Sequence, residues 1–166
     1  MSGKGIVKSG ELWYIVGHSG GGYYIMLLGE YEYRIDQKGR VAIPAKLRKE
    51  FPDGLVLTRG FDKCMLAYPM AEWNKISDNF SNLPTTLDKN RRLNRLTFGR
   101  ACNVELDGQG RIALPAPLRQ YAQINDTVVI AGVNKYLEIW SKELWDKEQL
   151  LMDEQAWQLA EGMEFR

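Results

Sequence analysis

The architecture of the chain follows from the stretch Asp36-Gln-Lys-Gly-Arg-Val-Ala-Ile-Pro-Ala-Lys-Leu-Arg48, because a similar stretch occurs a second time. A close copy, Asp107-Gly-Gln-Gly-Arg-Ile-Ala-Leu-Pro-Ala-Pro-Leu-Arg119, begins 71 positions later. Eight of the thirteen positions are identical and fall in register. The chain is therefore a tandem repeat of one structural unit.

Each copy has the pattern of a strand, a sharp turn and a return strand. Residues 31–36 alternate apolar and polar side chains, as a half-buried strand does, and residues 103–107 lead into the second copy in a similar way. The carboxylate of the aspartate can accept hydrogen bonds from backbone N–H groups just ahead of it. The glycine three positions later adopts a positive φ at no steric cost. We therefore expect the chain to reverse at each of these sites.

The two return strands, residues 40–43 and 111–114, are short. A proline that suits the first residue of a helix stops each of them. An isolated hairpin of this length is marginal in water, so each unit must bury its apolar face against another. Two copies in one chain therefore predict intertwined halves.

The similarity between the copies continues beyond the motif. Each copy predicts a strand, a turn, a second strand and a helix that carries a tryptophan, expected to close the core of its half. In the first copy these are a short helix at 44–51, strands at 55–58 and 64–68 around a turn at 60–63, and a helix from Pro69 with Trp73; in the second they are strands at 128–130 and 136–140 around a turn at 132–135, and a helix with Trp145.

Both copies resemble the SpoVT/AbrB swapped-hairpin domain. Their pairing in a chain of this length, after an opening Met26-Leu-Leu-Gly-Glu-Tyr, resembles the MraZ family, and the resemblance runs from about Met26 to the C-terminus. It implies an α+β, mainly β fold, in which two swapped-hairpin units form an intertwined pseudo-twofold barrel with peripheral and C-terminal helices.

The same resemblance implies a function. Members of such a family are expected to be bacterial transcriptional regulators of the division and cell-wall gene cluster, repressing their own operon among others. The expected partners are double-stranded promoter DNA with direct repeats and further copies of the chain in a ring-shaped homo-oligomer, with no membrane and no cofactor. The expected location is the cytoplasm, at the nucleoid.

The candidate DNA-binding residues lie on the two turns. Arg40 and Arg111 come first, because a guanidinium just beyond a rigid turn can meet guanine O6 and N7 or bridge phosphate oxygens. Lys38 and Gln109, at matching turn positions, would add phosphate or base contacts. The first turn is the more basic, so we predict that Arg40→Ala weakens operator binding at least as much as Arg111→Ala while leaving assembly intact.

Four further residues are expected to form the turns and not to touch DNA. Asp36 and Asp107 would hold the backbone, since a carboxylate facing phosphate would repel it, and Gly39 and Gly110 would let the chain bend. The matching arginines at the end of each motif, at positions 48 and 119, lie on short helices, where an internal salt bridge is the expected role.

Composition and charge support a globular protein with one basic region. The hydrophobic content is 45% and the net charge is +1. Residues 34–119 carry 16 basic and 9 acidic side chains, whereas residues 141–166 carry 3 and 7. This asymmetry suits phosphate binding by one face, and solvated surface charge is the alternative. Cys64 and Cys102, 38 positions apart, suggest neither a disulfide framework nor a zinc site.

The sequence divides into five parts. These are an extension at 1–25 that we expect to be non-native or upstream-translated, the first repeat at 30–77, a basic linker helix and lead-in strand at 78–103, the second repeat at 104–147, and an acidic C-terminal helix and tail at 148–166. No apolar run approaches the length of a transmembrane helix, and residues 1–25 lack the apolar core of a signal peptide.

Two helices outside the repeats carry distinct faces. The linker helix at 86–96 has basic side chains on its polar positions, with Leu87 and Leu93 expected toward the core; its basic face is either solvated or in contact with phosphate. Ser141 can cap the final helix. That helix has more apolar surface than a free helix tolerates, so we expect it to dock on the body or on a neighbouring subunit.

Two other functions compete with DNA-binding regulation, that of an enzyme and that of an antitoxin. Gly17-His-Ser-Gly-Gly21 matches the nucleophile elbow of α/β-hydrolases, but the catalytic histidine must follow the serine and the only histidine in the chain is His18. The chain also has neither H-E-x-x-H nor a phosphate loop, so an enzyme is not expected. An antitoxin of the same fold group, binding DNA and a toxin, remains open as the alternative.

Overall fold

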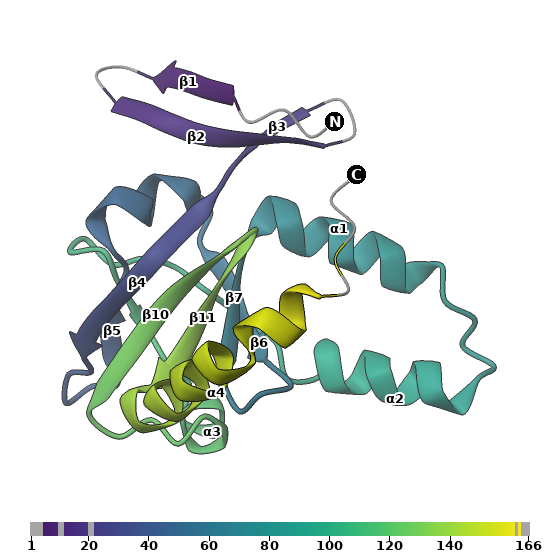
Figure 1. Cartoon of the computed structure of the whole chain (residues 1–166). Coiled ribbons are helices and arrows are strands. Elements are labelled where there is room, and N and C mark those ends of the chain that lie inside the picture. The colour runs from purple at the N-terminus through teal and green to yellow at the C-terminus, as the bar shows by residue number, and fades with distance from the viewer. Residues whose placement is uncertain (1–4, 10–11, 20–21, 162, 164–166) are drawn as a thin grey trace.

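The computed structural model describes residues 5–9, 12–19, 22–161 and 163. Its main body is built on a six-stranded antiparallel sheet in the order β4-β10-β11-β7-β6-β8 (Figure 1). The strands are β4 (Leu27–Arg34), β6 (Leu55–Arg59), β7 (Met65–Pro69), β8 (Cys102–Val104), β10 (Thr127–Asn134) and β11 (Tyr136–Ser141). The α+β class with predominant strands is therefore confirmed.

The lead-in strand of each repeat pairs with the other repeat. β4 of the first repeat runs antiparallel to β10 of the second, from Arg34 opposite Thr127 to Leu27 opposite Asn134. β8, which leads into the second repeat, pairs with β6 of the first. The return strands β5 (Arg40–Ala42) and β9 (Arg111–Ala113) pair with each other as a separate two-stranded sheet. The strands of the two repeats thus form two sheets, and a closed intertwined barrel stays a prediction.

One hydrophobic core serves both repeats. Val41 and Ile112 face each other across the β5–β9 pair and are 1% and 0% exposed. They join a cluster that draws on both copies and includes Leu57, Leu118 and Ile130. Tyr31 and the other inward side chains of β4 pack against the same cluster, which explains the alternation seen in the sequence. Neither repeat has a core of its own.

The helices cover this core and lead away from it. The prolines at the ends of the return strands precede two short helices, the 3-10 helix η1 (Ala45–Glu50) and α3 (Ala116–Tyr121). α1 (Met70–Ser81) begins after Pro69, and Trp73 on it packs against Tyr68 and Phe98. These elements match the predicted order in both copies.

Three expectations about helices and turns need correction or refinement. The second-copy turn was predicted at 132–135, but β10 continues through Asn134 and the turn is confined to the step into β11. The reason is that β4 pairs with β10 along its whole length and holds it extended. The linker helix α2 (Asp88–Thr97) starts two residues late, and Leu87 is 47% exposed at its N-terminus rather than toward the core.

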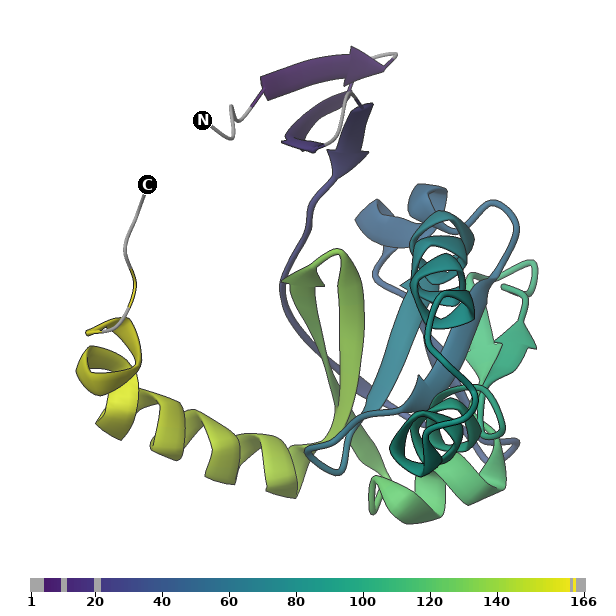
Figure 2. The same ribbon diagram turned by 90° about the vertical axis from the view of Figure 1, so that its right-hand side faces the viewer.

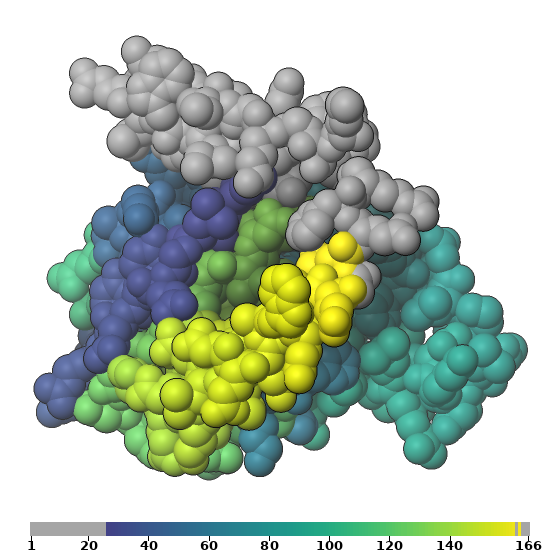
Figure 3. All heavy atoms as spheres, in the orientation of Figure 1, coloured from purple at the N-terminus to yellow at the C-terminus, as the bar shows by residue number. Residues whose placement is uncertain are grey.

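The C-terminal helix α4 (Lys142–Ala160) docks on the body along its first part only. The Ser141 hydroxyl accepts a hydrogen bond from the backbone N–H of Leu144 at 3.3 Å, as the capping prediction requires. Trp145 is buried against Trp140 and a second apolar cluster that includes Val129. A second contact follows at Gln149, whose side-chain amide donates to the Glu30 carboxylate on β4 at 3.0 Å. Beyond it α4 stands out as a ridge in Figure 3, and Figure 2 shows it leading away from the sheet.

The N-terminal segment forms strands of its own. β1 (Gly5–Ser9), β2 (Leu12–Ser19) and β3 (Gly22–Ile25) make a three-stranded antiparallel sheet. The hydrolase-like motif at 17–21 extends beyond the described residues, as does the proposed extension 1–25 in part. Among the described residues, no helix has the length and hydropathy needed to span a bilayer.

Candidate nucleic-acid interface

The two motif turns have the same internal geometry. The Asp36 carboxylate accepts hydrogen bonds from the backbone N–H groups of Lys38 and Arg40, each at 2.9 Å. In the second copy Asp107 accepts from the N–H groups of Gln109 at 2.9 Å and of Arg111 at 3.0 Å. One carboxylate oxygen therefore organises each loop.

A glycine completes each turn. Gly39 and Gly110 have φ of +74° and +75°, a region that residues with a Cβ rarely adopt. The N–H of each donates to the carbonyl of the aspartate that opens its turn, at 3.0 and 2.9 Å. The aspartate and the glycine thus act together, which is why both occur at the same spacing in each copy.

The pairing of the return strands joins the two turns through a short antiparallel ladder, with one turn at each end. Beyond the β5–β9 ladder, the N–H of Ile43 donates to the Gly110 carbonyl at 2.9 Å, and the N–H of Leu114 donates to the Gly39 carbonyl at 2.8 Å. Each turn is therefore hydrogen-bonded to the residue that precedes the helix-start proline in the other copy. A single rigid double turn results, with one half from each repeat.

Four charged side chains cross this double turn. Within each copy the arginine Nε donates to the aspartate, Arg40 to Asp36 at 2.8 Å and Arg111 to Asp107 at 2.9 Å. Between copies Arg40 lies 3.8 Å from Asp107, and Arg111 lies 3.8 Å from Asp36. We call these four residues the Asp–Arg quartet. Its two positive and two negative charges balance.

The surroundings of the carboxylates keep them ionised. The pKa of Asp107 is lowered to about 2, chiefly by the hydrogen bond from the backbone N–H of Arg111. The pKa of Asp36 is lowered for the same reason, by the backbone N–H of Arg40, with its side chain adding to the effect. Both carboxylates are therefore negative at neutral pH, and the quartet is complete there.

The predicted DNA-contacting residues fall into two groups. Arg40 and Arg111 do not project freely, because Nε of each is held by an aspartate, and their side chains are 29% and 28% exposed. Lys38 and Gln109 are exposed beside them on the two turns. Their backbone N–H groups serve the turns, so their side chains face solvent without weakening the loop. Lys38 and Arg40 lie at one end of the short antiparallel β5–β9 ladder, and Gln109 and Arg111 lie at the other. The ladder brings each arginine to 3.8 Å from the aspartate of the other turn.

Arg48 and Arg119 have a role that the sequence did not reveal. Instead of the predicted internal salt bridge, which neither makes among the described residues, each donates from Nε to a backbone carbonyl, of Ile43 at 2.8 Å and of Leu114 at 3.0 Å. Each guanidinium also lies against the turn glycine of the other copy, Arg48 by Gly110 and Arg119 by Gly39. The sequence contained one signal of this contact, because a turn glycine and a later arginine recur at the same spacing in both copies.

The comparisons with known proteins agree with this repeat architecture. A family model described as "MraZ protein, putative antitoxin-like" matches residues 26–96 and again residues 97–158. A protein of Dehalococcoides mccartyi named "Transcriptional regulator MraZ" is 48% identical over 140 residues, which cover 84% of this chain and 99% of that protein.

Two further relatives carry the same name. The one from Roseiflexus castenholzii is 44% identical over 131 residues, covering 79% of this chain and 92% of the relative. The one from Herpetosiphon aurantiacus is 51% identical over 120 residues, covering 72% and 84%. In all three, the similarity spans most of both proteins.

Proposed function

The chain belongs to the MraZ family, and from that premise we propose that it is a sequence-specific DNA-binding regulator of transcription. Its targets would be repeated promoter boxes in the bacterial division and cell-wall gene cluster, and its action there repression, including of its own operon. It would work in the cytoplasm at the nucleoid. It is not proposed to be an enzyme.

The observation that carries this proposal is the double turn. Two turns joined by a short antiparallel ladder, each fixed by an aspartate and a glycine, offer a compact surface with matched side chains on both halves. Protein side chains read DNA sequence from such projections only when the backbone holds them in place. The exposed Lys38 and Gln109 would meet phosphates or base edges first.

Arg40 and Arg111 would serve DNA in a second way. With Nε held by an aspartate, the terminal nitrogens of each guanidinium keep a fixed orientation, which favours a bidentate contact to guanine or to phosphate. The aspartates would then act as positioning groups and not as DNA contacts. This assigns a joint role to the quartet: it holds the turns together and orients both arginines.

Assembly completes the proposal. We expect the swapped strands to form an intertwined pseudo-twofold barrel and several copies to form a ring-shaped homo-oligomer. Such an assembly would place several double turns along repeated boxes, and each bound turn would raise the effective concentration of the next.

Binding of the purified protein to the DNA upstream of its start codon tests the proposal. Lys38→Ala should lower affinity by about 3- to 10-fold at unchanged thermal stability, and Lys75→Ala, an exposed lysine on α1, is its matched control. Arg40→Ala should cost on the order of 1–3 kcal/mol of binding, at least as much as Arg111→Ala, with assembly intact. Wild-type binding by both Lys38→Ala and Arg40→Ala would refute the assignment of the double turn to DNA.

The antitoxin alternative has one observation in its favour, the wording "antitoxin-like" in the family description. An antitoxin should bring down a small protein in a fixed ratio when the tagged chain is purified from its own cells. DNA binding without such a partner would favour regulation alone.

A further inference from the structure

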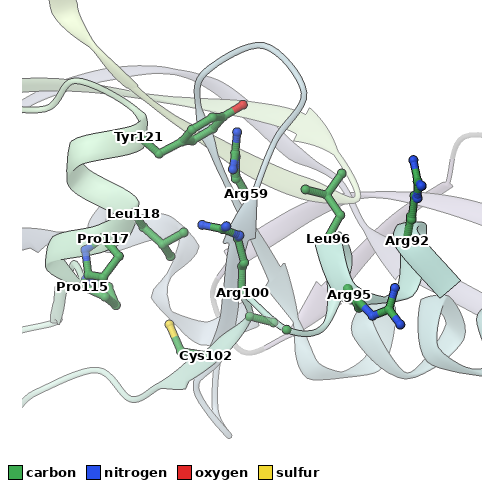
Figure 4. Close-up of a pocket in the computed structure, with 12 residues that line it drawn as sticks. Arg59, Arg92, Arg95, Leu96, Arg100, Cys102, Pro115, Pro117, Leu118 and Tyr121 are labelled. Carbon is green, nitrogen blue, oxygen red and sulfur yellow. The ribbon is translucent and has the colours of Figure 1, made fainter.

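An arginine-lined pocket lies on the opposite side of the molecule from residues 150–160 of α4, which are exposed and are called here the free part of α4. It has a volume of about 660 Å³ and is bordered by α2, α3 and the segment between α2 and β8 (Figure 4). Four of its lining residues are arginines: Arg59 at the end of β6, Arg92 and Arg95 on α2, and Arg100. We call it the arginine pocket.

The positive charge of this pocket is largely uncompensated. None of the described residues that line it is acidic. Arg92 pairs with Asp88 at 2.9 Å, but Arg59, Arg95 and Arg100 have no carboxylate within ion-pair distance in the described part of the chain. Like charges gathered in this way favour an acidic partner.

The pocket also has an apolar side. Leu96 and Leu118 line it, and the Arg59 guanidinium lies 3.7 Å over the Tyr121 ring, whose hydroxyl donates to the Gly60 carbonyl at 2.7 Å. The stacked guanidinium is held flat and keeps its N–H groups available at its edge. A matching partner would therefore present carboxylates between apolar side chains.

The free part of α4 presents that pattern. Leu150, Asp153, Glu154 and Trp157 follow one another at spacings of three, four and seven residues from the first, so they share one face of the helix. Leu150 is 64% and Trp157 80% exposed, and both carboxylates between them are exposed. A helix with this much bare apolar surface is typical of a protein contact surface.

We propose that this face of α4 in one copy docks into the arginine pocket of a second copy. Asp153 and Glu154 would pair with Arg95, Arg100 and Arg59, while Leu150 and Trp157 cover the apolar side around Leu96 and Leu118. The inference deepens the self-association included in the proposed function, by naming the two surfaces that meet.

The placement of the two surfaces decides the geometry of the contact. In Figure 2 the free part of α4 extends to one side of the sheet, and α2 and α3 lie on the other. One copy therefore cannot fill its own pocket in this conformation. The contact is head-to-tail, and repeated head-to-tail contacts close into a ring or continue as a filament.

Sedimentation velocity of the full chain with reversed charges tests the inference. The tail variant, Asp153→Lys with Glu154→Lys, and the pocket variant, Arg95→Glu with Arg100→Glu, should each weaken self-association at least about tenfold, because attraction becomes repulsion. The chain that carries all four changes should recover assembly, since its surfaces are again complementary. Asp78→Lys, an exposed reversal on α1, is the matched control and should assemble as wild type.

Mixing the tail variant with the pocket variant gives a sharper readout. The lysine tail of one fits the glutamate pocket of the other, and the unchanged acidic tail of the second fits the unchanged arginine pocket of the first. Neither variant should assemble alone, and the mixture should recover assembly with the two variants alternating. Circular dichroism establishes that each variant is folded. Trp157→Ala, which leaves every charge in place, provides a second route and should also weaken assembly.

Several results would overturn the inference. The first is a wild-type chain that remains monomeric. The second is a tail or pocket variant that assembles normally. The third is a chain with all four changes that fails to recover the assembly lost in the tail and pocket variants. If the pocket instead holds DNA phosphates, the pocket variant would keep its size and lose part of the salt dependence of DNA binding. A wild-type monomer that still binds DNA would refute this inference and the proposed assembly but not DNA binding, whereas an assembled chain that ignores DNA would refute only the DNA-binding proposal.

Discussion

At the scale of single residues, the double turn depends on carboxylates that each satisfy several donors. Asp36 and Asp107 accept two backbone N–H groups and one arginine Nε apiece, so no other side chain supplies the same set of contacts. Asparagine would keep one oxygen for the backbone but would present an amide to the arginine. The interactions are charge-assisted, which makes them stronger than neutral hydrogen bonds.

Replacement of the turn glycines should reveal how tightly the copies fit. Gly110→Ala and Gly39→Ala should each lower the free energy of unfolding by about 1–3 kcal/mol, because φ is positive at both sites. Gly110→Ala should cost more, since an added Cβ would collide with the Arg48 side chain, whereas at Gly39 it would lie 3.0 Å from the Arg119 guanidinium carbon. Gly108→Ala, with no atom within 4 Å of the added Cβ, is the control for urea unfolding. Equal stability of all three variants would contradict this packing.

The quartet should also make stability depend on pH. The folded pKa of Asp107 is about 2 and that of Asp36 is lowered, below the ordinary value of about 3.9. Their contribution to the free energy of unfolding is therefore complete above the pKa of the unfolded state, and it is lost as pH falls toward the pKa of the folded state. Thermal unfolding from pH ~6 to ~2 should show Asp107→Asn less stable at the upper end and less steeply dependent on pH below ~4.

Asp53→Asn is a suitable comparison, because Asp53 is exposed and lies outside the quartet. It should follow the wild-type profile. A pH profile for Asp107→Asn as steep as that of the wild type would show that the quartet does not supply this pH-dependent part of the stability.

At the scale of elements, the length of β10 is set by its neighbour. Residues 132–135 read as a turn because they contain glycine and asparagine, yet Gly132 sits opposite Gly29 inside the β4–β10 pair. A Cβ on Gly132 would approach the backbone of Leu27 to 2.6 Å. Gly132 is thus required by the close approach of two strands and not by a turn.

Gly132→Ala should therefore act on the pairing of the two repeats. The added Cβ would clash with backbone, which cannot rotate away as a side chain can. We therefore expect the free energy of unfolding to fall by about 1–3 kcal/mol or more. Hydrogen exchange should locate the loss in β4 and β10. Gly108→Ala is again the matched glycine replacement. Unchanged exchange in β4 would show that the strand accommodates the extra carbon without moving.

At the scale of the whole molecule, the repeats are inseparable because their strands and side chains cross. β4 pairs with β10, β8 with β6 and β5 with β9, and the quartet adds charges across the same boundary. Removing either copy would leave strands without partners. Each chain is therefore expected to present one double turn, and reading of repeated DNA boxes would require several chains.

DNA with different numbers of boxes should test that requirement. If copies of the chain bind together, DNA with several boxes should be bound on the order of 10²-fold more tightly than DNA with one box. The tail variant, which lacks the proposed contact between copies, should lose most of this gain and keep its affinity for a single box. Fluorescence anisotropy at fixed salt measures both. Equal affinity of the wild type for one box and for several would contradict multivalent binding.

The sequence alone determined the features that depend on neighbouring residues. Duplication of Asp36–Arg48 exposed the repeat, and the aspartate, glycine and proline within it specified turn, return strand and helix start, because their hydrogen bonds and φ preferences act over a few residues. The pairing of the strands, the approach of Arg40 to Asp107 and the place of Gly132 within a strand depend on tertiary contacts. These features arise between residues distant in sequence, where the pairing of one strand fixes the environment of another and no local pattern records it.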